Sequence, residues 1–374
     1  MSNKDDFLIQ FKYFEKENTD LKIGKPLGRG GFGAVRNIII NKKEWAGKLI
    51  EKKTGQKSEE EKYGVVLRGK NIVNITKILS SKIGQHEYNL IIMEKAALRD
   101  LGKLNEFLYK HNLLKLIYNP FYEIIEDNLL RFYTKQIINA LELLDRNYYV
   151  HNDIKPENIL VGLQLVIKLT DFSLLRKVKD QKTKIPGGTQ GYLSPEYYIN
   201  KDVNSEIARK QDYFALGSTL YLLKYGKSML NYKRYSDDEK IIIAEEIVKL
   251  LEQSKDNIKS GKMSDGKFID FLCSLIDYEP EDRPSFEEIY RNIWLNKNLE
   301  QINNISSIHQ GDEEKMIMEL QKSGHLIKKE KEYEQDINSE NENEQKSKKN
   351  KYIKKDKNKL KSNRLCRFRF KKKP

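Results

Sequence analysis

The stretch HNDIKPENIL, residues 151–160, places two carboxylates, two amides, a lysine and a histidine directly before an apolar strand. Asp153 and Asn158 are five positions apart, and Asp171 follows Asp153 after eighteen. Asn158 and Asp171 carry oxygen atoms of the kind that Mg²⁺ prefers. Asp153 is suited to accept a proton from a hydroxyl or to orient it, and Lys155 to neutralise charge on a phosphoryl group during transfer. The alternative is a set of polar residues that only cap the loop. We favour the chemical interpretation, because three residue spacings agree with it at the same time.

A glycine cluster, LGRGGFGAV at 27–35, contains Gly28, Gly30 and Gly33 in the spacing Gly-x-Gly-x-x-Gly. Such clusters more often mark ordinary turns. A dinucleotide-binding fingerprint needs a helix directly after the glycines, so that the pyrophosphate lies on its N-terminus. The continuation, AVRNIIINKKEWAGKLI, has the pattern of strand, turn and strand. We therefore expect a glycine-rich hairpin whose backbone N–H groups approach phosphate oxygens.

Lys48 lies in the predicted strand WAGKLI, between apolar neighbours. It is either an edge-strand lysine facing water or an ammonium directed inward at phosphates. An inward lysine needs a carboxylate partner, because an unpaired buried charge is costly. Three consecutive acids on the next predicted helix are candidates, namely Glu59, Glu60 and Glu61.

The first part of the chain reads as strands. Apolar-rich segments broken by Gly, Asn and Lys turns predict strands at 20–30, 34–40, 44–50 and 88–94. Between them, SEEEKYGVVLRG at 58–69 has a capped helix start. Residues 1–20 form an N-terminal extension of mixed composition, which we expect to be peripheral.

From residue 100 the pattern becomes helical. The segment 127–150 repeats apolar residues at helical spacing, and two short strands surround ENILVG and VIKLTDF. A polar segment at 173–191 precedes helical periodicity that continues to about 297. A β-rich half followed by a larger α-rich half predicts two lobes, and ligand sites favour such junctions. The helix face predicted within 127–150 consists of Leu130, Tyr133, Ile137, Ala140, Leu141 and Leu144.

The net charge of +14 belongs to the C-terminal segment. Residues 346–374 hold fifteen Lys or Arg and one Asp, so residues 1–345 sum to zero. Residues 330–345 carry seven acids and one lysine. We expect residues 298–374 to be a disordered, low-complexity tail. Its basic block suits nuclear import, nucleic-acid contact or an anionic membrane surface, and a purely solvated tail is the alternative.

Two cysteines are too few for a disulfide framework, which favours a reducing compartment. The first residues lack the apolar core of a signal peptide, and the longest apolar runs are far shorter than the ~20 residues that span a bilayer. We expect a soluble monomer of the cytoplasm or the nucleus, without a transmembrane segment.

The motifs together resemble the signature set of the eukaryotic-type protein kinases, in the same order: Gly-x-Gly-x-x-Gly-x-Val, Ala-x-Lys, His-x-Asp-x-Lys-x-x-Asn and Asp-Phe. GTQGYLSPE at 188–196 resembles the end of a kinase activation segment. DYFALG at 212–217 resembles the helix whose Asp anchors the catalytic loop. Arg283 resembles the arginine that pairs with the Glu of Pro-Glu, here Glu196. The resemblance covers about 21–297 and defines the expected kinase domain.

The resemblance implies an α+β, two-lobed fold and transfer of the γ-phosphoryl of ATP, with Mg²⁺, to a protein hydroxyl. Lys155 and Thr189 resemble the serine/threonine branch. Asp153 and Lys155 would be catalytic. Glu60 is the favoured partner of Lys48, with Glu59 and Glu61 open. Met93 would be the gatekeeper, and the backbone of 94–96 would bind adenine. The implied metal ligands are Asn158 and Asp171, and the implied ATP-binding residues are Leu27, Gly28, Gly30, Gly33, Val35, Ala46, Lys48, Glu60, Met93, Glu94 and Ala96.

Three positions depart from the pattern. Asn152 replaces the Arg that normally receives a phosphate on the activation segment. We therefore hypothesise that activity does not require phosphorylation of that segment, for example at Thr183. Ser173 replaces the Gly after Asp-Phe and restricts the backbone. Ser194 stands for the usual Ala before Pro-Glu. The alternatives are a pseudokinase scaffold that binds nucleotide without turnover, and a protein that acts mainly through its basic tail.

Overall fold

The computed structural model describes residues 6–30, 33–52, 55, 57–64, 66–96, 100–111, 125, 127–162, 165–178, 185–198, 202–226, 228–229, 249 and 266–296. The predicted tail at 298–374 lies outside these residues, as do Thr183 and the tip of the glycine hairpin at 31–32. The expectations about disorder, nucleic acid and membranes in the tail therefore stay predictions.

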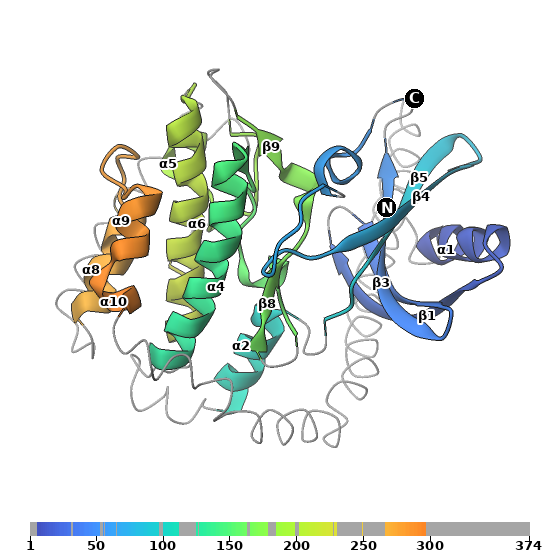
Figure 1. Ribbon diagram of the computed structural model, residues 1–374, viewed down its shortest axis with the longest axis horizontal. Coiled ribbons are helices and arrows are strands. Elements are labelled where there is room, and N and C mark those ends of the chain that lie inside the picture. The colour runs from blue at the N-terminus through green and yellow to red at the C-terminus, as the bar shows by residue number, and fades with distance from the viewer. Residues whose placement is uncertain are drawn as a thin grey trace, which may run out of the picture. The chain divides into compact units, whose positions relative to one another are not determined.

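The β-rich half is one antiparallel sheet in the order β1-β2-β3-β5-β4 (Figure 1). A tight turn joins β2 to β3, with positive φ at both Asn41 and Lys42, as hairpins of matching twist require. The expected glycine-rich hairpin is formed by β1 and β2, which pair as far as Gly30 and Gly33. The fourth strand was not predicted, because its sequence, ITKILSSKI, does not alternate strictly between apolar and polar residues. The strands are β1 (Leu21–Gly30), β2 (Gly33–Ile40), β3 (Lys43–Lys52), β4 (Ile75–Ile83) and β5 (His86–Met93).

A helix at the N-terminus, α1 (Asp6–Glu17), covers one face of this sheet and lies beside β1 (Figure 1). The expectation of a peripheral extension was therefore wrong. Phe11 and Phe14 are 0% and 1% exposed and pack among the apolar side chains of the strands. The backbone N–H of Ile23 donates to the Glu15 carboxylate at 2.9 Å. Aromatic residues spaced three and four apart give the helix a continuous apolar face.

The helix predicted at 58–69 is a single turn, η1 (Glu60–Gly64), of π-helical geometry. Its capped start is present, since Glu61 N donates to the Ser58 hydroxyl at 3.2 Å and Ser58 N donates to the Glu61 carboxylate at 2.7 Å. The predicted length was wrong. The turn ends at Gly64, where a Cβ atom would lie 2.6 Å from Ile75 Cδ1.

The helical half is built around α4 (Asp127–Arg146) and α6 (Ser205–Tyr225), which pack against each other (Figure 1). All six residues of the predicted α4 face are buried, which confirms the helical interpretation of that segment. Helix α6 is buried along most of its length. It begins at Asn204, whose side chain accepts from Ile207 N, and ends at Gly226 with φ 68°.

The remaining elements complete the two-lobed α+β arrangement that the sequence predicts. The two expected short strands, β7 and β8, are present and pair with each other, and β6 pairs with β9. The sheet half is linked to β8 by backbone bonds from Val73 N to Leu169 O and from Leu169 N to Asn71 O, both 2.9 Å. These elements are α2 (Leu101–His111), β6 (Tyr149–Val150), η2 (Pro156–Asn158), β7 (Ile159–Val161), β8 (Ile167–Leu169), η4 (Phe172–Leu174), β9 (Arg176–Lys177), α5 (Pro195–Tyr198), α8 (Gly266–Leu275), α9 (Phe286–Arg291) and α10 (Ile293–Asn296).

Among the ranges that the structure describes, no helix has both the length and the apolar composition needed to cross a bilayer.

Helix α1 contributes to the stability of the sheet half. Replacing Phe11 by Ala removes a fully buried ring, and we expect the free energy of unfolding to fall by about 3–5 kcal/mol. Ile9→Ala on the same helix is the control, because Ile9 is 60% exposed. Its effect should stay within about 0.5 kcal/mol. Urea unfolding followed by circular dichroism measures both, and equal effects would show that α1 is not part of this core.

Candidate active site

The register of the sheet brings the predicted phosphate-binding residues into one row. Gly28 lies opposite Val35 on β2, and Val35 lies opposite Lys48 on β3. A Cβ atom at Gly28 would meet nothing within 4 Å, so this position leaves free space above the strands. Gly33 is required by packing, because a Cβ there would lie 2.0 Å from Leu49 O. The hairpin therefore offers exposed backbone next to Lys48.

The flanking predicted residues lie along the same strands. Leu27 is half-buried on β1, and Gly30 pairs with Gly33 at the end of the hairpin. Ala46 lies opposite Met93 in the β3–β5 register. Since side chains two apart on a strand share a face, Ala46 and Lys48 face the same side of the sheet.

The end of β5, which the resemblance assigns to adenine, is fixed on two sides. Glu94 N donates to Asn74 O at 3.0 Å. The Glu94 carboxylate accepts from Asn74 N at 2.6 Å and from Lys168 Nζ at 2.7 Å. Ala96 is half-buried, and residues 97–99 lie outside the described ranges. Thr170, just before Asp171, donates its hydroxyl to Met93 Sδ at 3.9 Å. This contact links the predicted gatekeeper position to the segment that contains Asp171.

Lys48 is directed inward. Its side chain is 9% exposed, and its Nζ lies 3.0 Å from Glu60 Oε1 and 2.6 Å from Asp171 Oδ1. The alternative of a lysine facing water is excluded. Burial alone would lower the pKa of Lys48, but the charges and hydrogen bonds of Asp171 and Glu60 raise it above its usual value. Lys48 is therefore charged.

The partner of Lys48 is Glu60, one of the three acids that the sequence left open. Glu61 instead caps the turn at Ser58. Glu59 instead accepts from Lys62 at 2.8 Å and pairs with Arg176 at 3.3 Å. The single turn of η1 is enough to direct these neighbouring side chains to different partners.

The hydrogen bonds that the described residues make to the Asp171 carboxylate end on one of its two oxygens. Its Oδ1 accepts from Lys48 Nζ, from Ser173 Oγ at 2.7 Å and from Ser173 N at 3.3 Å. Burial by itself would raise the pKa of Asp171, but the charge and hydrogen bond of Lys48 outweigh it, and with Ser173 they hold the pKa at about 2. Every hydrogen bond to this carboxylate from the described residues falls on Oδ1, which leaves Oδ2 for a cation.

Asp153 is the centre of a polar network on the loop before η2. Lys155 Nζ donates to Asp153 Oδ2 at 2.7 Å and to the Thr189 hydroxyl at 2.6 Å. The Thr189 hydroxyl donates to Asp153 Oδ1 at 2.7 Å. Asn158 Nδ2 donates to Asp153 Oδ2 at 2.8 Å. A hydroxyl thus fits directly against the carboxylate, beside a lysine.

Helix α6 holds this loop through Asp212. Its carboxylate accepts from His151 N at 2.7 Å and from Asn152 N at 2.9 Å. The His151 ring is buried, and its burial lowers its pKa, so the ring is neutral. A neutral ring has one donor and one acceptor, which matches donation from Nε2 to Thr170 O at 3.0 Å and acceptance from Asp153 N at 3.3 Å.

The donor atoms near Asp153 fit a magnesium ion. Asn158 uses its amide nitrogen on Asp153, so its amide oxygen remains an acceptor. With Asp171 Oδ2, this makes two oxygen ligands. The described residues contain no group of three or more His, Cys, Asp or Glu side chains placed for a metal. Mg²⁺ is commonly bound by one or two protein oxygens, with substrate phosphates and waters completing its octahedron.

Sequence reasoning missed the contacts of Asn152. Its backbone has φ 66°, and its side chain donates to Leu174 O at 2.9 Å and to Val150 O at 3.3 Å. The one signal in the sequence is the residue type itself, because Asn tolerates a positive φ better than most other residues do. The acceptors are backbone carbonyls, so no residue type points to them.

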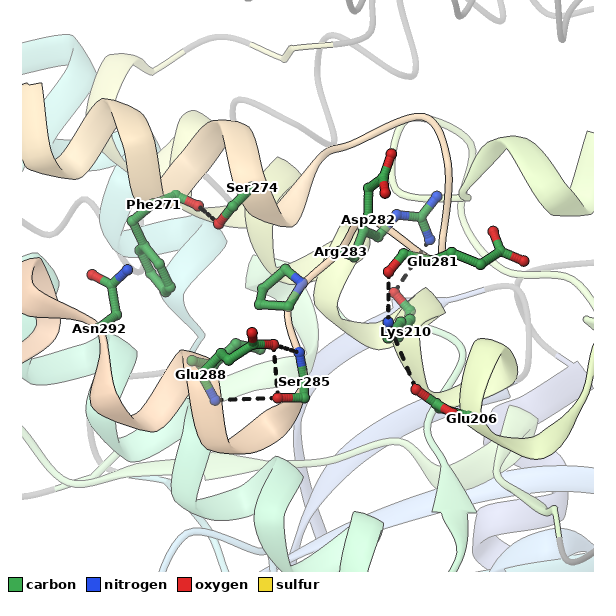
Figure 2. A pocket seen from close by; sticks show the side chains of 12 residues that line it. Glu206, Lys210, Phe271, Ser274, Glu281, Asp282, Arg283, Ser285, Glu288 and Asn292 are labelled. Carbon is green, nitrogen blue, oxygen red and sulfur yellow. Dashed lines mark hydrogen bonds and ion pairs between the residues drawn. The ribbon is translucent and has the colours of Figure 1, made fainter.

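The expected pair of Glu196 and Arg283 is present and buried, with two parallel bonds of 2.8 and 2.7 Å. Arg283 also borders a pocket of about 490 Å³ between α6, α8 and α9 (Figure 2). Figure 2 shows the reciprocal bonds of Ser285 and Glu288 that cap α9 in its wall. None of the predicted catalytic, nucleotide-binding or metal residues lines this pocket.

Comparisons with known proteins agree with the geometry. A family model described as "Protein kinase domain" matches residues 21–295. The Aurora kinase of Saccharomyces cerevisiae is 29% identical over 283 residues, 75% of this chain and 70% of that protein. The Aurora kinase of Schizosaccharomyces pombe is 28% identical over 277 residues, 74% and 71% of the two chains. The human "Hormonally up-regulated neu tumor-associated kinase" is 26% identical over 305 residues, 78% of this chain and 38% of that protein.

The raised pKa of the Asp212 carboxyl group should make the stability of the protein depend on pH. Burial raises its pKa to about 7 in spite of the two backbone N–H bonds. The unfolded chain releases this proton near pH 4, so the stability that the group contributes is complete below about pH 4 and is lost as the pH rises to about 7. Between these values the free energy of unfolding should fall by up to about 1.4 kcal/mol per pH unit.

Asp212→Asn removes this titration. Urea unfolding of both proteins between pH 5 and 8 should show the stability of the wild type declining relative to the variant up to about pH 7, and a constant difference above it. Parallel curves over the whole range would contradict the raised pKa.

Proposed function

Because the chain belongs to the protein kinase family, we propose that it transfers the γ-phosphoryl group of ATP to a serine or threonine hydroxyl of a protein. The observation that carries the proposal is the network at Asp153. A hydroxyl, that of Thr189, already lies 2.7 Å from this carboxylate, and Lys155 donates to both. A substrate hydroxyl in the same place would meet a proton acceptor and a positive charge.

The other residues of the site position the nucleotide. The backbone of the glycine hairpin would cover the phosphates, and Lys48, oriented by Glu60, would bind them. Asn158 and Asp171 would hold Mg²⁺, which when bound offsets the charge of the phosphates. Lys155 would offset charge on the group in transfer. The contribution of these residues is mostly positioning and electrostatic stabilisation.

Specificity for serine and threonine is supported by the contact between Lys155 and Thr189. These are the two residues that resemble the serine/threonine branch. The two Aurora kinases compared above match 74–75% of this chain at 28–29% identity.

The direct test is transfer from ATP labelled at the γ-phosphate to a generic basic protein with Mg²⁺. Asp153→Asn should lower kcat by about 100-fold or more while ATP binding is retained. Asp171→Ala should abolish transfer by removing a metal ligand. Asp270→Asn on the exposed face of α8 is the matched control and should leave the rate unchanged. Nucleotide binding without transfer by the wild type would favour the pseudokinase alternative.

The pairing of Lys48 has its own test. Glu60→Gln removes a charged partner of the buried ammonium, and we expect kcat/KM for ATP to fall about tenfold or more. Glu61→Gln is the control next to it, because a glutamine oxygen can still accept from Ser58 N. Equal losses in the two variants would show that Glu60 has no special part in the site.

A further inference from the structure

The backbone after Asp171 is held by two side chains at positions where the sequence departs from the kinase pattern. Ser173 donates its hydroxyl to Asp171 Oδ1 at 2.7 Å. Asn152 donates its side-chain amide to Leu174 O at 2.9 Å. The two bonds end on residues that lie before and after Phe172. Both donor groups are neutral, and both bond directly to the segment 171–174.

The backbone of Asn152 is held in place independently of the side-chain bond to Leu174. It is 3% exposed, and its backbone N–H is bonded to Asp212 Oδ1 at 2.9 Å. A Cβ atom at Gly188 would lie 2.6 Å from Asn152 O, so the stretch that leads to Thr189 also packs against this residue. Asn152 therefore contacts both described ends of the segment between Asp171 and Thr189.

Ser173 stabilises an unfavourable conformation at Asp171. The backbone of Asp171 is left-handed, with φ 63° and ψ 77°, and its side chain caps η4 by accepting from Ser173 N. Non-glycine residues adopt this conformation at a cost, which local hydrogen bonds offset. The hydroxyl of Ser173 adds a second bond to the same oxygen, so both Ser173 donors fall on Oδ1 and neither occupies Oδ2.

Further contacts extend this hold along the chain. Arg176 Nη1 lies 3.3 Å from Glu59 Oε1 on the turn that carries Glu60. Val150 and Arg176 are register partners in the β6–β9 pair, and Val178 N donates to Tyr148 O at 2.7 Å. All of these contacts are present in the unmodified chain.

We propose that Asn152 and Ser173 are positioning residues that hold Asp171 ready to bind Mg²⁺ without a phosphate on the segment. The proposal rests on the function proposed above and assigns part of its regulation to these two side chains. Losing either contact should weaken the response to Mg²⁺. It should not change the maximal rate at saturating Mg²⁺, because Lys48 still holds Asp171.

The variants separate the hydroxyl and the amide from simple packing. Ser173→Ala keeps the Cβ atom and loses the donor, whereas Ser173→Thr keeps the donor. Asn152→Leu keeps the approximate shape and loses the amide. Because Leu is strained at φ 66°, Asn152→Gly is measured beside it and should give the same shift, since Gly loses the amide without that strain. Ser194→Ala is the matched control, because the Ser194 hydroxyl is buried and has no hydrogen-bond partner among the described residues.

The experiment is a Mg²⁺ titration of the full chain with a fluorescent, non-hydrolysable ATP analogue, repeated as transfer rate against Mg²⁺ concentration. Ser173→Ala and Asn152→Leu should raise the half-saturating Mg²⁺ concentration about three- to tenfold, the value of one hydrogen bond. Ser173→Thr and Ser194→Ala should stay within about twofold of the wild type. Amide hydrogen exchange of the ligand-free variants should be faster at 172–178 and unchanged in α6.

An unchanged or lower half-saturating Mg²⁺ concentration in Ser173→Ala and Asn152→Leu overturns the proposal, even if melting temperatures fall, since the residues would then be merely structural. A shifted Mg²⁺ response in binding, with no transfer by the wild type, would refute the kinase activity and support the positioning role. If the wild type bound no nucleotide, the proposed function would fail, and exchange would decide alone: unchanged rates at 172–178 would overturn the positioning role, and faster rates would support it.

Discussion

The buried ammonium of Lys48 is the constraint on which the site depends. A charge that is 9% exposed must be compensated, and it is compensated by two carboxylates from different parts of the chain. Glu60 comes from the turn between β3 and β4, and Asp171 lies 123 positions after Lys48. One lysine therefore links the sheet, the short turn η1 and the segment that contains Asp171.

The rest of the sheet half supports that lysine. Strand β3 carries Lys48 toward the site and Leu49 toward the opposite face, because side chains alternate along a strand. Leu49 is fully buried in the cluster that α1 covers with Phe11 and Phe14. The N-terminal helix thus belongs to the core that packs against β3, the strand that carries Lys48.

In the helical half, buried polar side chains hold the loop that carries Asp153. Asp212 holds the backbone before Asp153 from α6. Arg283 holds Glu196 at the far end of the following segment with two bonds, and both side chains are almost completely buried. Such groups are costly unless every one of them is paired, so they specify one arrangement of the loops.

Much of this site could be predicted from the sequence, because its chemistry is carried by residue types at fixed spacings. The order of the glycines, Lys48, Asp153, Asn158 and Asp171 predicted a hairpin and a phosphoryl-transfer site, and the structure brings these residues to neighbouring elements.

Other features had no such signal. Which of the three consecutive acids pairs with Lys48 depends on the direction in which a single helical turn points each side chain. The stabilising effect of helix α1 comes from tertiary packing, which a short amphipathic segment does not reveal by itself. The contacts of Asn152 and Ser173 end on a backbone carbonyl and a neighbouring carboxylate, which the sequence pattern does not mark.

We infer that Lys48, Glu60, Asp153, Asn158 and Asp171 form one site for a nucleotide and its cation. A crystal structure of the chain with a non-hydrolysable ATP analogue and Mg²⁺ tests it most directly. We expect Mg²⁺ to be bound by Asp171 and Asn158, and Lys48 to contact the phosphates while it stays paired with Glu60. A nucleotide bound elsewhere, or a cation on other ligands, would show that these residues do not form one site.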